Sequence, residues 1–106
     1  MNLRQNGCGQ ARIVPAQVEQ ALPGVAADGP WDVVVLDPPR QGCSRGVLDR
    51  LVSVQAERLI YVSCDPSTLA RDLSVLVRGG YRCTSLRPID LFPQTFHLES
   101  VALLER

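Results

Sequence analysis

Two strand-forming runs in this chain each lead into an Asp-Pro step, and a helical pattern follows each step. The first run covers residues 32–37 and the second covers residues 58–63. The first is continuous and β-branched, which is typical of a strand buried on both faces of a sheet. A strand, a helix and another strand in this order form a parallel unit with a crossover helix. The chain is therefore predicted to be an α/β protein.

Helical patterns occupy the segments after these two runs. One helix is predicted from about residue 44 to residue 56, and a second from Pro66 to the glycines at 79 and 80. Asp65 is well placed to cap the second helix, because a carboxylate at this position accepts from free backbone N–H groups. Before the first strand, residues 17–22 predict only a helical turn or two, which Pro23 and Gly24 are expected to end.

Two further strands, residues 81–91 and 96–104, are predicted near the C-terminus with no helix between them. Such a pair should be antiparallel, because parallel neighbours need a crossover connection. The order is that of the second half of a doubly wound sheet, within one domain covering residues 1–106. The chain has no Gly-rich GxGxxG turn, which normally follows the first strand of such a sheet.

Composition excludes several classes of protein. The chain has 106 residues, and eleven basic and eleven acidic side chains give no net charge. A strongly basic chain would indicate nucleic-acid binding, and zero net charge neither indicates nor excludes it. With a single histidine and no CxxC pair, no metal site is predicted. The polar start and the lack of a long apolar run predict a cytoplasmic protein with reduced thiols and no membrane association. The four cysteines are Cys8, Cys43, Cys64 and Cys83.

Cys64 stands apart from the other cysteines because it lies between a predicted strand and a predicted helix. Ligands bind at this end of the strands in open α/β sheets, and a helix N-terminus favours the nucleophilic thiolate. A cysteine is otherwise often a small buried apolar residue. A phosphatase loop is excluded, because it needs an arginine six residues after the cysteine, where this chain has Ala70.

Two other segments contain polar residues whose presence calls for an explanation. Asp37-Pro38-Pro39-Arg40 ends the first buried strand, and its two prolines make a rigid loop that holds a carboxylate and a guanidinium. The alternative is a simple strand-to-helix turn. His97 and Glu99 stand two residues apart and should share one face of the last strand. A solvated edge would explain them, but the strand is otherwise largely apolar.

Together these segments resemble the RNA 5-methyluridine methyltransferases, the S-adenosylmethionine-dependent enzymes that methylate uracil C5 in tRNA and 23S rRNA. The resemblance covers essentially the whole chain, as the C-terminal part of a Rossmann-like class I methyltransferase domain. Asn2 and Asn6-Gly7 also fit that family's Asn-Ala-x-x-Asn-Gly helix, with Leu3 in place of alanine. The segments that carry it are residues 37–40, 63–72 and 92–99.

The resemblance implies a role for each matching residue. Cys64 would add to C6 of uracil, which makes C5 nucleophilic, and Glu99 would remove the C5 proton. Asp37 and Arg40 would line the pocket for cofactor and uracil. The target base would have to be flipped out or unstacked. Possible walls for this base are Phe92, Phe96 and His97.

The resemblance also implies S-adenosyl-L-methionine as the cofactor and tRNA or 23S rRNA as the partner. Asn2, Ala16 and Asp37 match positions near the cofactor, although an acidic residue often occurs where this chain has Pro15-Ala16-Gln17. The family's Gly-rich turn, its N-terminal RNA-binding domain and, in some members, iron–sulfur cysteines have no counterpart here. Met1 falls within an expected helix, so we expect a fragment of a longer protein or a truncated product.

Two other functions remain open. The chain could be a non-catalytic remnant that binds RNA or a protein through the same fold. It could also be a methyltransferase that uses Asp-Pro-Pro to bind an amino group, but that motif normally continues with an aromatic residue where this chain has Arg40, and Cys64 would then have no role. An incomplete sheet would also leave a free edge that favours self-association.

Overall fold

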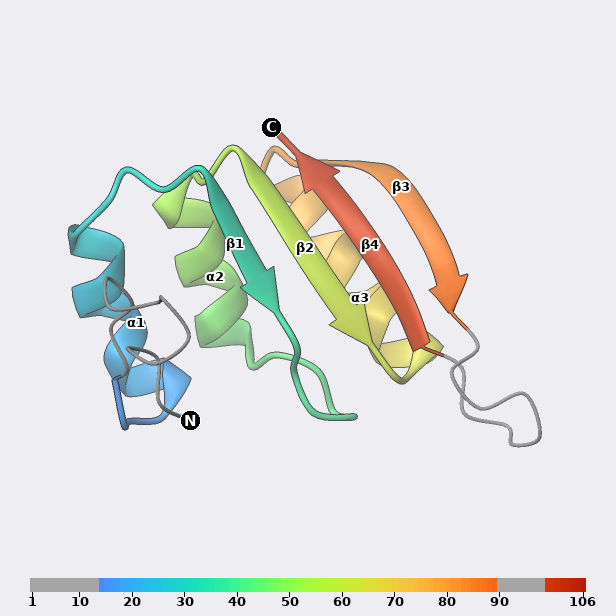
Figure 1. Cartoon of the computed structure of the whole chain (residues 1–106), viewed down its shortest axis with the longest axis horizontal. Helices are drawn as coiled ribbons and strands as arrows, with labels where there is room; N and C mark the ends of the chain where they lie inside the picture. The colour runs from blue at the N-terminus through green and yellow to red at the C-terminus, as the bar shows by residue number, and fades with distance from the viewer. Residues whose placement is uncertain (1–13, 90–98) are drawn as a thin grey trace, which may run out of the picture.

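A mixed β-sheet with helices along one of its faces forms the body of the protein (Figure 1). The computed structural model describes residues 14–89 and 99–106. In chain order the elements are α1 (Val18–Ala27), β1 (Val33–Leu36), α2 (Arg45–Val54), β2 (Arg58–Ser63), α3 (Pro66–Arg78), β3 (Arg82–Ile89) and β4 (Glu99–Glu105).

The four strands lie in the order β1-β2-β4-β3. Strands β1 and β2 are parallel, and α2 connects them. Strand β4 is antiparallel to β2 on one side and to β3 on the other. The predicted antiparallel pair at the C-terminus is therefore confirmed over the described residues. The predicted ends of this pair, residues 90–91 and 96–98, lie outside them.

Local capping groups fix where α2 and α3 begin. The Ser44 hydroxyl accepts a hydrogen bond from the amide of Val47 at 3.3 Å. The Asp65 carboxylate accepts from the amides of Ser67 at 2.8 Å and Thr68 at 3.3 Å. Pro66 occupies the first turn of α3, where its missing N–H costs nothing. Both helices were predicted, and the N-cap role of Asp65 is confirmed.

The prediction that Pro23 ends the first helix is wrong. Helix α1 continues through Pro23 to Ala27. A proline inside a helix removes one backbone hydrogen bond, but its fixed φ is itself helical. Contacts elsewhere hold the second half of α1, because the Trp31 indole donates to the Val25 carbonyl at 2.9 Å and Leu22 packs against the core. Tertiary packing therefore outweighs the local signal.

The core lies between the sheet and the helices. Figure 1 shows α2 behind and beside β1, and α3 behind β2 and β4. Every second residue of β2 and β4 points into this layer, and the largest fully buried side chains there include Tyr61, Leu59 and Leu104. No helix in the described residues is long and apolar enough to cross a membrane.

The prediction that β1 is buried on both faces is wrong for the described residues. Val33 is 43% exposed and Val35 is 63% exposed, whereas their neighbour Val34 packs against the core. In Figure 1 the helices lie on the far side of the sheet and the near face is open. We call this surface of β1, β2 and β4 the open face. Its apolar side chains follow the pattern of a strand that is covered on both sides.

Candidate functional site

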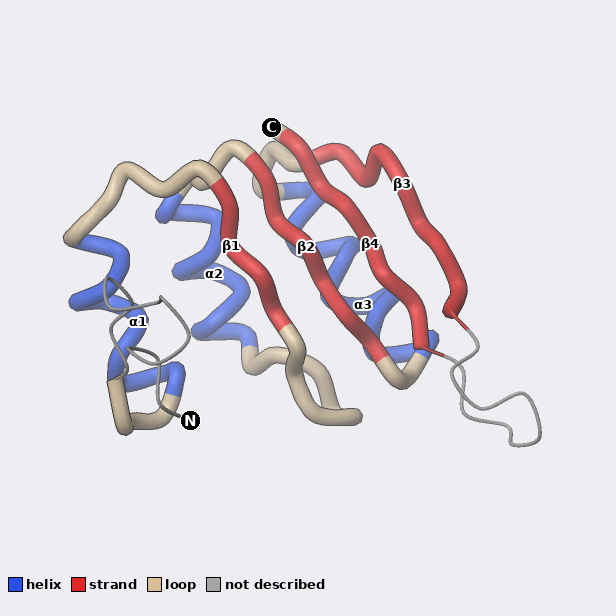
Figure 2. The backbone as a smooth tube through the Cα atoms, in the orientation of Figure 1, coloured by secondary structure: helices blue, strands red, loops and turns tan. Residues whose placement is uncertain are grey.

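Three chain segments converge at one edge of the sheet. Strands β1 and β2 both end there, and β4 begins there (Figure 2). Parallel strands end at the same edge, and an antiparallel neighbour must start at it. The loop after β1, the turn after β2 and the start of β4 are therefore neighbours. This arrangement brings together predicted site residues that are far apart in the sequence.

Cys64 lies in the turn between β2 and α3, and its side chain is exposed. Hydrogen bonds on both sides hold this turn. The hydroxyl of the buried Ser63 donates to the Asp65 carbonyl at 2.9 Å and accepts from the Asp65 amide at 3.1 Å. Asp65 in turn caps α3. The thiol is thus presented to solvent from a firmly bonded turn, as a nucleophile requires.

Glu99 is the first residue of β4 and is partly exposed. The ladder between β2 and β4 pairs Ser63 with Ser100. Cys64 follows Ser63 and Glu99 precedes Ser100, so the predicted nucleophile and base lie next to the same end of one ladder. The strand order thus brings both residues to the same end of the sheet, and a direct contact between their side chains stays a prediction.

Asp37 and Arg40 lie in the loop from β1 to α2, residues 37–44, which we call the β1–α2 loop. Both side chains are exposed. Asp37 lines a cavity of about 280 Å³ that is bounded by the start of α1, the end of β1 and this loop. Ala16 is exposed just before α1, two residues from Val18, which also lines that cavity. Four of the predicted site residues, Asn2, Phe92, Phe96 and His97, lie outside the described residues.

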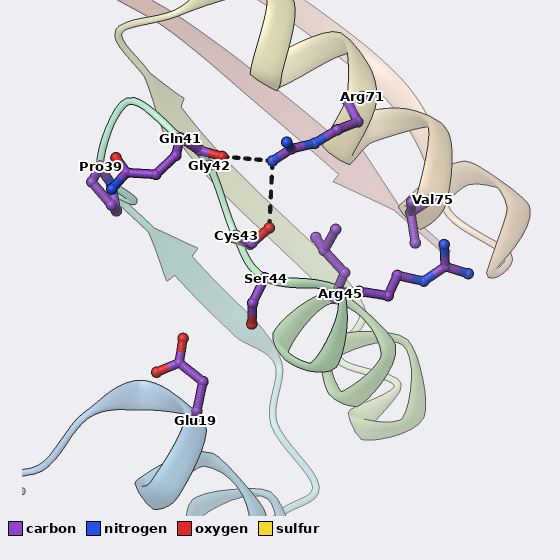
Figure 3. A pocket seen from close by; sticks show the side chains of 10 residues that line it. Glu19, Pro39, Gln41, Gly42, Cys43, Ser44, Arg45, Arg71 and Val75 are labelled. Atoms are coloured by element: carbon purple, nitrogen blue, oxygen red, sulfur yellow. Dashed lines mark hydrogen bonds between the residues drawn. The ribbon is translucent and has the colours of Figure 1, made fainter.

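A larger cavity of about 620 Å³ also borders the β1–α2 loop and shares part of its lining with the first (Figure 3). Its walls include Glu19 of α1, Arg45 of α2 and Arg71 of α3. Figure 3 shows the Arg71 guanidinium reaching from α3 to the loop, where it donates to the Gln41 carbonyl at 2.6 Å. Cys64 is not among the residues that line either cavity.

Cys43 is the second cysteine near this edge, and its surroundings disfavour the thiolate. Burial, with a further contribution from the charge of Asp72, raises the pKa of the Cys43 thiol from 9.0 to about 11. Burial also raises the pKa of Tyr61, as does the hydrogen bond that its hydroxyl donates to Asp72. Cys43 therefore remains protonated at neutral pH. Cys64 is the better candidate for a nucleophile because its side chain is exposed, whereas that of Cys43 is partly buried.

Sequence reasoning gave no role to the polar face of α3 that contacts the β1–α2 loop. Thr68, Arg71 and Asp72 stand at helical spacing, and each bonds to the loop. The signal was present in the sequence, because Asp72 interrupts the apolar stripe that Leu69 and Leu76 continue. A charged residue on a core-facing stripe indicates a buried polar contact.

Comparison with known proteins identifies the family. The family model described as tRNA (Uracil-5-)-methyltransferase matches residues 26–106. This chain belongs to that family. The match includes Asp37, Arg40, Cys64 and Glu99, and it confirms the resemblance on which the site prediction rests.

Individual relatives agree with this assignment. An uncharacterized RNA methyltransferase of Halalkalibacterium halodurans is 45% identical over 105 residues, which are 98% of this chain and 23% of the relative. Another, from Gloeobacter violaceus, is 49% identical over 105 residues, which are 99% of this chain and 22% of the relative. The chain thus spans less than a quarter of the curated relatives that it matches.

A solved structure shows a similar fold. The crystal structure of Pyrococcus abyssi tRNA (uracil-54, C5)-methyltransferase in complex with S-adenosyl-L-homocysteine matches with a TM-score of 0.63 and 41% sequence identity. The match covers 69% of this chain and 18% of that chain. The mixed α/β fold of the described residues is therefore found in a methyltransferase of this family.

Proposed function

We propose that this chain is the C-terminal part of a catalytic domain that methylates C5 of a uridine in tRNA or rRNA with S-adenosyl-L-methionine. The observation that carries the proposal is the position of Cys64 and Glu99 at one end of the β2–β4 ladder. A thiol and a carboxylate at the same end of the sheet, within a uracil-5-methyltransferase family, match the two needs of this reaction.

C5 of uracil is a poor nucleophile and must be activated before it can accept a methyl group. The Cys64 thiolate adds to C6, and the electron pair of the C5–C6 double bond moves toward C5 and the C4 carbonyl. The cofactor supplies a methyl group on a positively charged sulfur. After C5 is methylated, the Glu99 carboxylate takes the proton from C5, the double bond reforms and the thiolate leaves. The net change is that a methyl group replaces the proton on C5 of uracil.

The β1–α2 loop is proposed to hold the target base. The Arg40 guanidinium and the Asp37 carboxylate can donate to and accept from the polar edge of uracil. Both are exposed beside the edge at which Cys64 lies. The base must leave any stack for C6 to reach the thiol, so it must be flipped out or already unpaired. Phe92, Phe96 and His97 are proposed walls for the extruded base.

The residues around Asp37 fit part of a cofactor that combines an apolar body with positive charge. Val35, Leu36 and Pro38 give the 280 Å³ cavity apolar walls, and Asp37 and Glu19 give it two carboxylates. Ligand sites of whole cofactors are usually larger, about 300–1,000 Å³. The chain's own proposed contacts are Asn2, Ala16 and Asp37, which are too few to bind the cofactor tightly.

We propose that a longer parent protein supplies the remainder of the domain. Two observations support this: the chain spans less than a quarter of its relatives, and the open face carries apolar side chains such as Val35 at 63% exposure. The parent is proposed to act in the cytoplasm. When the chain stands alone, the free edge of β1 is proposed to pair with a second copy, since unpaired strand edges favour such association.

The test is RNA methylation by the parent protein carrying Cys64→Ala. We expect loss of 5-methyluridine formation, because the thiol has no substitute at C6. Cys83→Ala is the matched control, because Cys83 is also exposed but lies on β3. Methylation at the normal rate by the Cys64→Ala parent would refute the mechanism. RNA binding without methylation by the unmodified parent would favour the non-catalytic alternative.

A further inference from the structure

One face of α3, in the first half of the helix, is bonded to the β1–α2 loop. Thr68, Arg71 and Asp72 are spaced so that they lie on the same side of the helix. The Thr68 hydroxyl donates to the Arg40 carbonyl at 2.8 Å, and Arg71 donates to the Gln41 carbonyl at 2.6 Å. Asp72 accepts from the Cys43 amide at 2.8 Å. The same helix begins two residues after Cys64, so the loop and the thiol share one support.

Asp72 joins the loop to strand β2 as well. Its side chain is 0% exposed. One carboxylate oxygen accepts from the Cys43 amide and, at 2.5 Å, from the hydroxyl of Tyr61, three residues before Cys64. The other accepts from Arg71 Nε at 3.1 Å. This one carboxylate thus touches the loop, the strand that precedes the nucleophile and the helix that follows it.

Stability alone does not explain why a carboxylate is buried at this position. Removing its charge from water costs several kcal/mol, and an apolar side chain in the same place is often as stable or more so. What the carboxylate provides is direction, because its bonds are short, charge-assisted and lie in fixed directions. The arrangement therefore specifies where the loop lies relative to β2 and α3.

Gly42 shows how closely the β1–α2 loop approaches α3. Its φ of +76° is in the left-handed region that favours glycine. A Cβ atom there would lie 2.5 Å from Asp72 Oδ2 and 2.7 Å from Arg71 Nη2. The loop backbone and the α3 side chains are in direct contact, with no space for a side chain between them.

We propose that Asp72, with Thr68 and Arg71, positions Asp37 and Arg40 relative to Cys64, so that a uracil held by the loop meets the thiol. This inference rests on the proposed function for its catalytic consequence only. These three residues do not touch the reacting atoms. They act through the loop and through the turn at Cys64, and they are positioning residues.

The first test measures amide hydrogen exchange at Gly42 and Cys43 in this chain by NMR. Asp72→Asn replaces a charge-assisted acceptor by a neutral one, which is roughly half as strong, so exchange at Cys43 should be about tenfold faster. Asp49→Asn is the control, because Asp49 is an exposed acid bonded only to Arg45 among the contacts described. Unchanged exchange in Asp72→Asn would overturn the inference.

Thr68→Val and Thr68→Ser keep the test decisive if Asp72→Asn does not fold. Valine keeps the shape and loses the hydroxyl that binds the Arg40 carbonyl, whereas serine retains it. Loop exchange should rise in Thr68→Val and return to the original rate in Thr68→Ser. Equal exchange in both variants would contradict a positioning role for this hydroxyl.

The second test uses single-turnover methylation by the parent at saturating RNA and cofactor, per folded enzyme. Thr68→Val should lower this rate about five- to tenfold, the equivalent of one hydrogen bond of roughly 1–1.4 kcal/mol, and Thr68→Ser should restore it. A purely structural role would lower the folded fraction and leave the rate per folded enzyme unchanged, which would overturn the inference. A wild-type parent without methylation would refute the proposed function, and loop exchange would then decide the positioning role by itself.

Discussion

Tyr61→Phe should destabilise the protein by about twice as much as Tyr81→Phe. Both tyrosines are buried, at 0% and 1% exposure, and both hydroxyls make one short hydrogen bond. Tyr61 donates to the Asp72 carboxylate at 2.5 Å, whereas Tyr81 donates to the neutral Ala56 carbonyl at 2.6 Å. The same atom is removed from a buried position in each variant, and the two positions differ chiefly in the charge of the acceptor.

The expected magnitudes follow from the acceptors. A hydrogen bond to a charged group contributes about 1.5–3 kcal/mol and a neutral one about 0.5–1.5 kcal/mol. We therefore expect losses of about 2 kcal/mol for Tyr61→Phe and about 1 kcal/mol for Tyr81→Phe. In a domain of this size each kcal/mol lowers the Tm by roughly 4–8 °C.

Urea denaturation followed by circular dichroism measures both free energies of unfolding. The slope with denaturant should stay the same in the two variants, because neither changes the surface exposed on unfolding. If Tyr61→Phe costs no more than Tyr81→Phe, the carboxylate of Asp72 is not the acceptor that stabilises this part of the core, and the reasoning is refuted.

Three further predictions concern the isolated chain. The pKa of Cys43 is raised in the folded state, so its contribution to stability is complete below about pH 9 and is lost as the pH rises toward about 11. Because the thiol is only half-buried, solvent screening reduces this contribution to about 1 kcal/mol. Between these pH values the free energy of unfolding should therefore fall less in Cys43→Ala than in the unmodified chain, as measured by unfolding at a series of pH values. Calorimetric titration should find weak binding of S-adenosyl-L-methionine or none, and micromolar affinity would contradict the few contacts proposed. Sedimentation should detect self-association that Val35→Lys weakens, and a monomer at high concentration would exclude pairing through β1.

Local rules predicted much of the fold. Strand β2 covers the predicted residues 58–63, and α3 begins at Pro66 after the expected Asp65 cap. These signals depend on a few neighbouring residues. The extension of α1 through Pro23 was not predicted because it depends on contacts with residues elsewhere in the chain. The open face of β1 was not predicted because the strand's composition does not show that one face stays uncovered in the described residues.

For the candidate site, too, the sequence predicts the topology but not the contacts between distant residues. Topology alone brings the ends of β1 and β2 to the start of β4, so the placement of Cys64 and Glu99 at one end of the sheet followed from the order of the strands. The contact between Asp72 and Cys43 joins residues 29 positions apart and depends on the path of the β1–α2 loop. A sequence pattern marks Asp72 as unusual, but it does not identify the partner.

The central claim is that Cys64 forms the bond to uracil and that Glu99 releases it. The most direct measurement uses the parent protein carrying Glu99→Gln with uridine-containing RNA and cofactor. A general base contributes about 10²–10⁴-fold, so elimination should stall and the protein–RNA adduct should survive denaturing electrophoresis. Digestion with nuclease and trypsin separates Cys64, in the peptide of residues 59–71, from Cys43, in the peptide of residues 41–45. The account predicts a nucleotide on the peptide of residues 59–71; a nucleotide on the peptide of residues 41–45, or normal turnover with no adduct, would contradict it.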